Sequence, residues 1–478
     1  MRVVLSDAGY SLMVETSVNF SATAAKGRQQ VTTTGNAILV AYDNRPILCT
    51  DPWIGDEEPA YFGSWVLSHT IPRELKEDIY QSEYVWFSHG HPDHLNPTSL
   101  ERFRGRKILL PDHVNSRILK DVSALGYHVS VLPDRTWVPL SPNIKIQCIT
   151  TKIQDAILLL DVCGKLFINL NDAGVRDCAH YIRSVSAGYA HSYVMALSGY
   201  GDADMINLYR DDGSFITPRA ASKPAPGLKL TEYAKATGAK AIIPFSTFHQ
   251  YQRTDSIWAQ SFTTPVAAFT EGLASNLQYI PAFSSVDCND LAVETRQPAE
   301  LRVTARSPEE FGDNWSDVLE QEDRKLIADY FSRKERIQKY FGFINFNVGG
   351  RDFTLRLRGR RSRGISFAVP RTSLMSAIKY RIFDDLLIGN FMKTTLYGVT
   401  SLYEGKGNFN FHATKFGDNG LAETEEELST YLAEYRRRAG TEYLVGILED
   451  KSRDFVVRFA GKNSRVYGAL KSAYFQFR

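Results

Sequence analysis

The chain has 478 residues, of which 43% are hydrophobic and 23% are charged, and its formal net charge is +2. This length allows two or three domains, and the composition is that of an ordinary globular protein. A net charge near zero excludes a general electrostatic attraction to nucleic acid or to a membrane surface.

Cysteine usage and the N-terminal sequence indicate the compartment. The five cysteines are odd in number and widely spaced, and Cys49, Cys148 and Cys163 lie in apolar, strand-like runs. We therefore expect buried free thiols rather than a disulfide scaffold, which favours a reducing cytoplasm. The first residues contain no long apolar core, so we expect no signal peptide. No apolar run approaches the ~20 residues that span a bilayer.

The first half of the chain alternates short apolar runs with helical patterns. Apolar runs bounded by turn residues predict strands, at 37–42, 47–50, 84–88, 108–111, 129–132, 144–149, 157–162 and 165–170. Runs with one apolar face predict helices, at 73–80, 99–103 and 114–126. This order predicts an α/β fold, an αββα sandwich in which two sheets pack together and helices cover their outer faces.

A domain boundary is expected near residue 290, because polar residues dominate the stretch 282–309. We therefore expect a metal-binding catalytic domain at 1–290 and a separate α+β domain at 291–478. No chemical motif is recognised in the second region. We expect it to shape a substrate pocket or to form the interface of a homo-oligomer.

Within this second region the pattern predicts three helices and a hairpin. The helices are expected at 317–340, 373–393 and 425–438, and the hairpin turns at Gly349-Gly350. Asp384 and Asp385 fall on the second of these helices. We interpret them as capping or hydrogen-bonding residues of a packed helix, with a catalytic acid pair as the alternative.

The most informative motif is the hexapeptide His89–His94, which follows the strand-like run 84–88. It places three of the chain's ten histidines and the carboxylate of Asp93 side by side. A strand fixes the backbone, and the loop after it can point several imidazoles at one spot. Neutral imidazole and carboxylate suit zinc, iron or manganese. The hexapeptide therefore predicts a transition-metal site, with a His-rich surface loop as the alternative.

The pattern His-x-His-x-Asp-His after an apolar strand resembles the signature of the metallo-β-lactamase fold family. Three further segments resemble that family in the expected order: the strand that ends at Asp51, the strand 165–170 followed by Asp172, and the strand and loop 241–249. The resemblance covers about residues 35–255. It implies the αββα fold and a metal-dependent activity.

The resemblance also implies a set of ligands for two metal ions. His89 and His91 would hold the first ion, and Asp93 and His94 the second. Asp172 would bridge the two ions, and His249 would complete the second site; a turn-capping Asp172 and a loop His249 are the alternatives. Asp93 and Asp172 are the expected catalytic carboxylates.

A narrower resemblance points to the branch that contains L-ascorbate-6-phosphate lactonase and CMP-N-acetylneuraminate hydroxylase. The segments that carry it are Asp51-Pro-Trp53, Trp65, Ser88–Pro97, Met195–Tyr200 and Pro244–Ser246. The hydroxylase family carries a Rieske domain, which needs a Cys-x-His and a Cys-x-x-His pair. This sequence contains one Cys-x-His, Cys178-Ala-His180, and no Cys-x-x-His. We therefore expect no Rieske module in it.

One ligand of the family pattern departs from expectation. Members usually supply a further histidine to the first metal, and neither His113 nor His128 is well placed for this role. The best positional match is Asp155, just before a predicted strand. A carboxylate ligand there would shift the preference from zinc toward iron or manganese. The alternative is a weak first site and a single bound metal.

Three hypotheses of function follow. The leading one is a cytoplasmic metal-dependent hydrolase that uses a metal-bound hydroxide on an ester, lactone, amide or phosphodiester. The second is a dinuclear iron oxygenase, similar to the hydroxylase branch, with an external electron donor. The third is a degenerate metal site in a binding protein. We expect two divalent ions, zinc first and iron or manganese otherwise, and a small-molecule substrate such as a phosphorylated compound or a sugar derivative.

Overall fold

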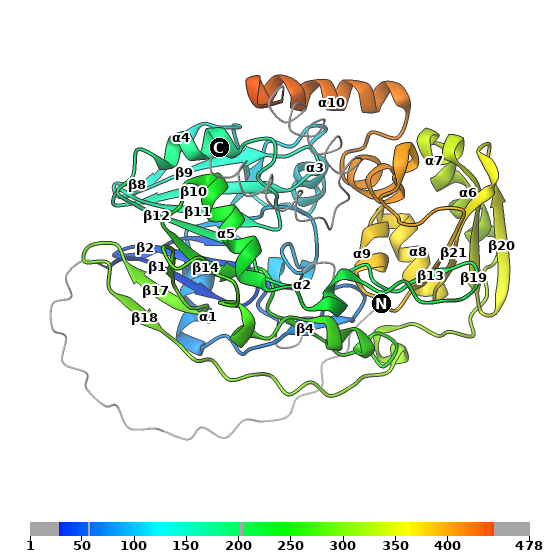
Figure 1. Cartoon of the computed structure of the whole chain (residues 1–478), viewed down its shortest axis with the longest axis horizontal. Helices are drawn as coiled ribbons and strands as arrows, with labels where there is room; N and C mark the ends of the chain where they lie inside the picture. Colours follow the sequence, from blue (N-terminus) through cyan, green and yellow to red (C-terminus); the bar gives the residue numbers. More distant parts are fainter. Residues whose placement is uncertain (1–27, 56–57, 201–203, 444–478) are drawn as a thin grey trace.

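The computed structural model describes residues 28–55, 58–200 and 204–443 of the chain (Figure 1). Its first sheet has eight strands in the spatial order β18-β17-β1-β2-β3-β5-β6-β7. These strands are β1 (Gln29–Thr34), β2 (Ile38–Asp43), β3 (Arg45–Thr50), β5 (Tyr84–Trp86), β6 (Lys107–Pro111), β7 (Val129–Leu132), β17 (Ser284–Asp287) and β18 (Val293–Thr295).

The second sheet has seven strands in the order β16-β14-β12-β11-β10-β9-β8. They are β8 (Trp137–Ser141), β9 (Ile144–Thr150), β10 (Ala156–Val162), β11 (Lys165–Asn171), β12 (His191–Leu197), β14 (Ala241–Phe245) and β16 (Gln278–Tyr279). A small two-stranded sheet pairs β4 (Trp65–Leu67) with β15 (His249–Tyr251).

Strands at the centre of both sheets are buried on both faces. In β2, Leu39 and Ala41 pack into the core between the two sheets, whereas Ile38 and Val40 face the opposite side. The same alternation in β10 sends Leu158 into the inter-sheet core and its neighbours toward outer helices. Successive side chains of a strand point to opposite faces, so a continuous apolar run is the sequence of a strand covered twice.

Helices cover both outer faces of this pair of sheets. α1 (Arg73–Gln81), α2 (Pro97–Glu101) and α3 (Arg117–Ala124) pack on the first sheet, and α4 (Ala179–Ser186) and α5 (Pro226–Thr237) on the second. The predicted αββα sandwich is therefore confirmed. α3 begins three residues later than expected, because Asn115 and Ser116 have positive φ angles of 69° and 53°.

The C-terminal region forms a third sheet with helices on it (Figure 1). The predicted hairpin around Gly349-Gly350 is confirmed. The strand order is β13-β22-β21-β19-β20, with β13 (Leu208–Arg210), β19 (Phe341–Val348), β20 (Arg351–Arg356), β21 (Arg360–Ala368) and β22 (Lys393–Tyr397). The helices are α6 (Gln321–Ser332), α7 (Glu335–Tyr340), α8 (Arg371–Tyr380), α9 (Phe383–Ile388), α10 (Glu425–Ala439) and the π-helical segment Asn410–Asn419.

Two of the predicted long helices are each broken in the structure. The helix expected at 317–340 divides into α6 and α7, because the buried Lys334 between them turns inward and pairs with Asp418 at 2.8 Å. The helix expected at 373–393 divides into α8 and α9 at Arg381, whose φ is +57°, and its last residue begins β22. A left-handed residue cannot continue a right-handed helix.

Strands cross the expected domain boundary in both directions. β13, from the first region, pairs with β22 in the third sheet, and β18, from the second region, pairs with β17 in the first sheet. One hydrophobic core also runs from the first sheet into the C-terminal region. The division at residue 290 thus remains a prediction, and any cut there would separate paired strands.

Two further expectations concern the thiols and the membrane. Cys49 and Cys148 are buried and unpaired, as expected, whereas Cys163 is only half-buried because it lies at the turn after β10. None of the helices in the described part of the chain is long and apolar enough to cross a bilayer.

Candidate metal centre

Segments that are distant in sequence meet at one edge of the sandwich. β11, β12 and β14 run parallel, so the residues after their carboxyl ends, among them Asp172 and Ser246, come together. β10 runs antiparallel to β11, so Asp155, directly before β10, lies at the same end. The loop after β5 brings the hexapeptide His89–His94 to this edge.

The first cluster of ligand atoms consists of His89, His91 and Asp172. His89 Nε2 and His91 Nδ1 face each other at 2.9 Å, and Asp172 Oδ2 lies 3.9 Å from His89 Nε2. Ser88 Oγ lies 2.8 Å from His89 Nδ1 and holds the other side of that ring. One nitrogen of each imidazole is thus aimed at a common point beside a carboxylate.

The second cluster consists of Asp93, His94 and the same Asp172. His94 Nε2 lies 3.5 Å from Asp93 Oδ2 and 3.4 Å from Asp172 Oδ2. The oxygen of Asp172 that faces the first cluster also faces the second. A carboxylate shared in this way is the arrangement that a bridging ligand of two metal ions requires.

A layer of charged and hydrogen-bonding groups fixes these side chains from behind. His94 Nδ1 lies 3.1 Å from Asp51 Oδ2, while Asp93 accepts from Tyr61 Oη at 2.5 Å and from Asn36 Nδ2 at 3.0 Å. Outer partners of this kind set the tautomer and the orientation of metal ligands. The resemblance had implied only a strand ending at Asp51, whereas the contacts of Tyr61 and Asn36 have no sequence signal.

Three carboxylates surround His94, and their negative charge sets the direction in which its pKa is shifted. Burial disfavours the protonated ring, but Asp93, Asp172 and Asp51 together raise the pKa of His94 well above its usual value. Burial likewise opposes the charge on Asp172, and the adjacent His94 nevertheless holds the pKa of that carboxyl at about 2. Such a concentration of buried negative charge stabilises a cation placed among these groups.

His249 presents a free ligand atom in the same neighbourhood. Its ring stacks on Trp65 at a centroid distance of 3.4 Å, and its Nε2 is buried without a hydrogen-bond partner. Burial lowers the pKa of His249 to about 3, so the imidazole is neutral and Nε2 can offer a lone pair. An orphaned buried nitrogen is costly unless something binds it.

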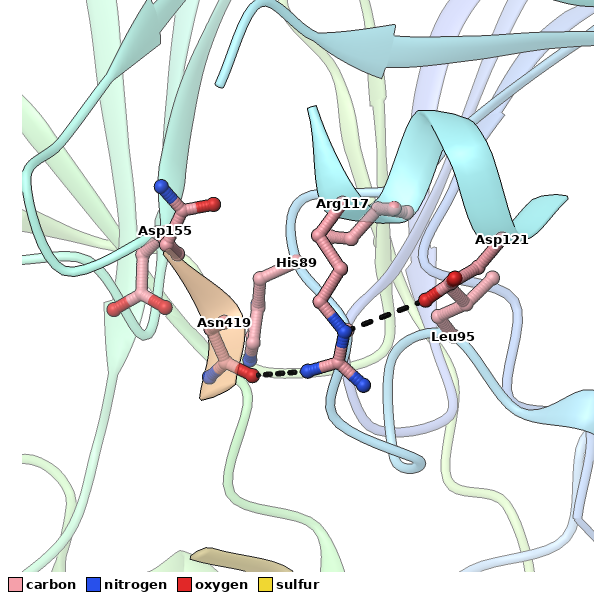
Figure 2. Close-up of a pocket in the computed structure, with 9 residues that line it drawn as sticks. His89, Leu95, Arg117, Asp121, Asp155 and Asn419 are labelled. Atoms are coloured by element: carbon pink, nitrogen blue, oxygen red, sulfur yellow. Dashed lines mark hydrogen bonds and ion pairs between the residues drawn. The ribbon is translucent and has the colours of Figure 1, made fainter. Parts of the chain in front are cut away.

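The three candidates for the remaining ligand of the first cluster lie at different places relative to it. Asp155 is buried, and Figure 2 shows it on the wall of the cavity that His89 also lines. His113 lies outside both clusters, with Nε2 3.5 Å from the carbonyl of Ser88, and His128 is exposed. Burial raises the pKa of Asp155, and the nearby Lys415 ammonium opposes that rise.

The residues brought together fit a pair of metal ions. Three imidazoles and two carboxylates supply the ligand atoms of the two clusters. The buried Nε2 of His249 has no other partner, and Asp155 lies on the wall of the cavity that His89 also lines. Hydrogen bonds hold the far side of several of these groups. The assignment of each residue as a ligand remains a prediction; its seven members are His89, His91, Asp93, His94, Asp155, Asp172 and His249.

Two residues at the site come from the C-terminal region and were missed. Asp384 Oδ2 lies 2.9 Å from His91 Nε2, and Lys415 Nζ lies 3.2 Å from the same nitrogen. The sequence favoured a capping or hydrogen-bonding role for Asp384, with a catalytic acid pair as the alternative. Its acidic character on an apolar helix was the available signal, because a buried carboxylate needs a partner. Lys415 lies in a π-helical segment that no pattern predicted.

A small cavity opens beside the first cluster (Figure 2). It has a volume of about 70 Å³ and is lined by His89, Gly90, Leu95, Arg117, Ile118, Asp121, Gln154, Asp155 and Asn419. The Arg117 guanidinium bonds Asn419 Oδ1 at 2.8 Å and lies 3.4 Å from Asp121. The cavity therefore joins candidate metal ligands at one side to a cation at the other.

Comparison with curated proteins gives distant relatives. No profile of a known protein family matches the chain. The cytidine monophosphate-N-acetylneuraminic acid hydroxylase of Danio rerio is 21% identical over 329 residues, which cover 62% of this chain and 53% of that protein. The inactive hydroxylase of Homo sapiens is 23% identical over 164 residues, which cover 31% of this chain and 32% of that protein.

The chain thus spans about half the length of the first of these relatives and about a third of the second. Among solved structures, a metallo-β-lactamase fold protein of Bacillus subtilis matches at 11% identity with a TM-score of 0.29. That match covers 45% of this chain and 85% of the other. The resemblance to the cytidine monophosphate-N-acetylneuraminic acid hydroxylases is confirmed at low identity.

Proposed function

We propose that this chain is an enzyme with a dinuclear metal centre at the edge of its αββα sandwich. His89, His91, Asp155 and Asp172 would hold one ion; Asp93, His94, Asp172 and His249 would hold the other. The position of Asp172 supports this most strongly, because its Oδ2 lies 3.9 Å from His89 Nε2 and 3.4 Å from His94 Nε2.

Hydrolysis is the reaction class that we propose first. A bound metal pair would lower the pKa of water and polarise the bond under attack. The residues of the chain would orient the reactants: Asp172 is held by a hydrogen bond from Ser246 Oγ, and Asp93 by Tyr61 and Asn36. Because these groups are fixed before the substrate enters, little reorganisation accompanies the reaction.

The cavity beside the first cluster supports a small anionic substrate. Arg117 would supply the positive charge that attracts the anion, because its guanidinium stays protonated. Leu95 and Ile118 give the cavity an apolar side. With about 70 Å³ of space, it would admit the reacting end of a substrate and leave the remainder outside. A phosphorylated compound or a sugar acid fits this description.

A dinuclear iron oxygenase is the second candidate. One observation supports it: Asp155 is a buried carboxylate that lines the same cavity as His89. An oxygen ligand at the first metal position would suit iron or manganese. The hydroxylase activity named for the curated relatives supports it as well. Oxygenation would require electrons from a donor outside the 478 residues of this sequence, whereas hydrolysis requires only water.

One experiment separates these reactions. The purified chain is stripped of metal, reloaded with zinc, manganese or iron, and given anionic esters, lactones and phosphodiesters with and without dioxygen. Turnover by the zinc or manganese form without dioxygen supports hydrolysis, and Asp172→Asn is expected to abolish it. Oxygen uptake by the reduced iron form, without hydrolysis by any form, would establish the second candidate. A chain that binds no metal would overturn both.

A further inference from the structure

We propose that the C-terminal region completes the metal centre, with Asp384 as the positioning residue of His91. This inference rests on the proposed function. It differs from the sequence-based expectation that the second region only shapes a pocket or an interface. Asp384 would not touch a metal ion, and it would act through the imidazole.

Both nitrogens of His91 are engaged, and they face different groups. Nδ1 lies 2.9 Å from His89 Nε2, in the first cluster, and Nε2 lies 2.9 Å from Asp384 Oδ2. A neutral imidazole carries one hydrogen, and a carboxylate can only accept. Lys415 Nζ, which can only donate, lies farther from Nε2, at 3.2 Å. We assign the hydrogen to Nε2 because the nearer group, Asp384, can only accept, and this leaves the lone pair of Nδ1 directed at the first metal position. Histidine ligands of metals commonly donate to a carboxylate in this way.

Asp384 is itself held in place and compensated in charge. It is 1% exposed, accepts a hydrogen bond from Asn419 Nδ2 at 3.3 Å, and lies 3.6 Å from Lys415 Nζ. A buried carboxylate without a counter-charge would be strongly disfavoured. Lys415 supplies the counter-charge, so Asp384 and Lys415 form a neutral unit from two different elements of the C-terminal region.

Lys415 also decides between a positioning role and a third metal site. His91, Asp384 and Asp385 lie close enough to suggest a further group of ligands. The Lys415 ammonium lies 3.2 Å from His91 Nε2 and 3.6 Å from Asp384 Oδ2, so a cation already stands against this group. A metal ion placed there would be repelled. The arrangement thus favours an outer support for the first metal position.

The test compares metal binding by Asp384→Ala, Asp384→Asn and the control Asp385→Asn. Burial and the charge of Asp384 raise the pKa of Asp385 well above its usual value, so asparagine mimics its protonated form. Metal content and competition with a chromophoric chelator are measured on each full-length protein. The thermal unfolding of the metal-free form is recorded as a measure of purely structural damage.

We expect Asp384→Ala to weaken the binding of one metal ion by about 10- to 100-fold and to leave the other unchanged. Asp384→Asn should lose less metal affinity than Asp384→Ala, because its amide oxygen can still accept a hydrogen bond from His91 Nε2. If the alanine variant does not fold, the asparagine variant provides the test. Asp385→Asn should match the wild type. Wild-type affinity for two ions in both Asp384 variants overturns this inference alone. A wild type that binds no metal overturns it together with the proposed function.

Discussion

His94 Nδ1 lies 3.1 Å from Asp51 Oδ2, and both side chains are fully buried. The two residues come from different loops of the first sheet, one after β3 and the other after β5, and the parallel pairing of these strands aligns the loops. Asp51 also accepts the backbone N–H of Ser88 at 2.7 Å. One carboxylate thus orients a candidate ligand and ties down the strand end that carries it.

Replacing Asp51 with asparagine tests this orientation. Asp51 has a φ of +41°, which asparagine tolerates, so we expect Asp51→Asn to fold. Loss of the carboxylate should weaken the binding of the second metal ion by about tenfold or more, as measured by chelator competition. Asp43→Asn replaces another buried carboxylate of the first sheet and should leave metal affinity unchanged. Equal affinities in the two variants would refute the role given to Asp51.

Removal of the His249 side chain should abolish the binding of one of the two metal ions. Its Nε2 is buried without a partner, so we expect His249→Ala to lower the bound metal from two equivalents to about one. His128→Ala removes an exposed imidazole and should retain both. The count is made by elemental analysis after dialysis. Two equivalents in the His249 variant would show that its orphaned nitrogen has no ligand role.

Asp155 is tested by the metal that the site selects. If its carboxylate completes the first position, Asp155→Ala should lower occupancy of that position and leave the second. Asp155→His should shift the preference from iron or manganese toward zinc, because imidazole replaces an oxygen donor. Competitive loading with equal amounts of the three metals gives the measurement. Identical metal content in all three proteins would mean that Asp155 belongs to the cavity wall alone.

A stability prediction concerns Lys334, between α6 and α7. Its ammonium is fully buried and lies 2.8 Å from Asp418 and 3.2 Å from Glu423. Lys334→Met would leave the buried carboxylate of Asp418 without its counter-charge and should lower the free energy of unfolding by about 3–5 kcal/mol. The neighbouring Arg333 is largely exposed, and Arg333→Met should cost less than about 1 kcal/mol. Denaturant titration would contradict this account if the two losses were equal.

A pH prediction concerns His412, which lies outside the candidate centre. Burial lowers the pKa of His412 from 6.5 to about 4. The unfolded chain therefore binds a proton below pH 6.5 that the folded protein refuses until about pH 4, so stability falls as the pH decreases through this window. His412→Gln should remove up to about 3 kcal/mol of that decline. A variant that loses stability with pH as steeply as the wild type would contradict the assignment, and His128→Gln serves as the exposed control.

Local patterns predicted much of the fold. Runs such as 157–162 alternate their contacts between two cores, and the hexapeptide lies directly after a strand whose end is fixed by its neighbours. The αββα arrangement and the clustering of His89, His91, Asp93 and His94 could therefore be expected from signals within about ten residues of each feature. The place of Asp172 beside them was implied only by the resemblance to the metallo-β-lactamase fold family.

Long-range contacts were not predictable in the same way. The helix expected at 317–340 breaks because Lys334 pairs with carboxylates far along the chain. The apolar periodicity of 317–340 gives no indication of these partners. Asp384 meets His91 across 293 positions of sequence. Only the fold brings such pairs together, so the contribution of the C-terminal region to the site appears in the structure alone.

Anomalous X-ray scattering from crystals of the metal-loaded protein tests the central claim most directly. The dinuclear assignment predicts two peaks about 3.5–4 Å apart, one beside His89 and His91 and one beside Asp93 and His94, with Asp172 between them. A single peak, or two peaks that do not share Asp172, would contradict the dinuclear centre.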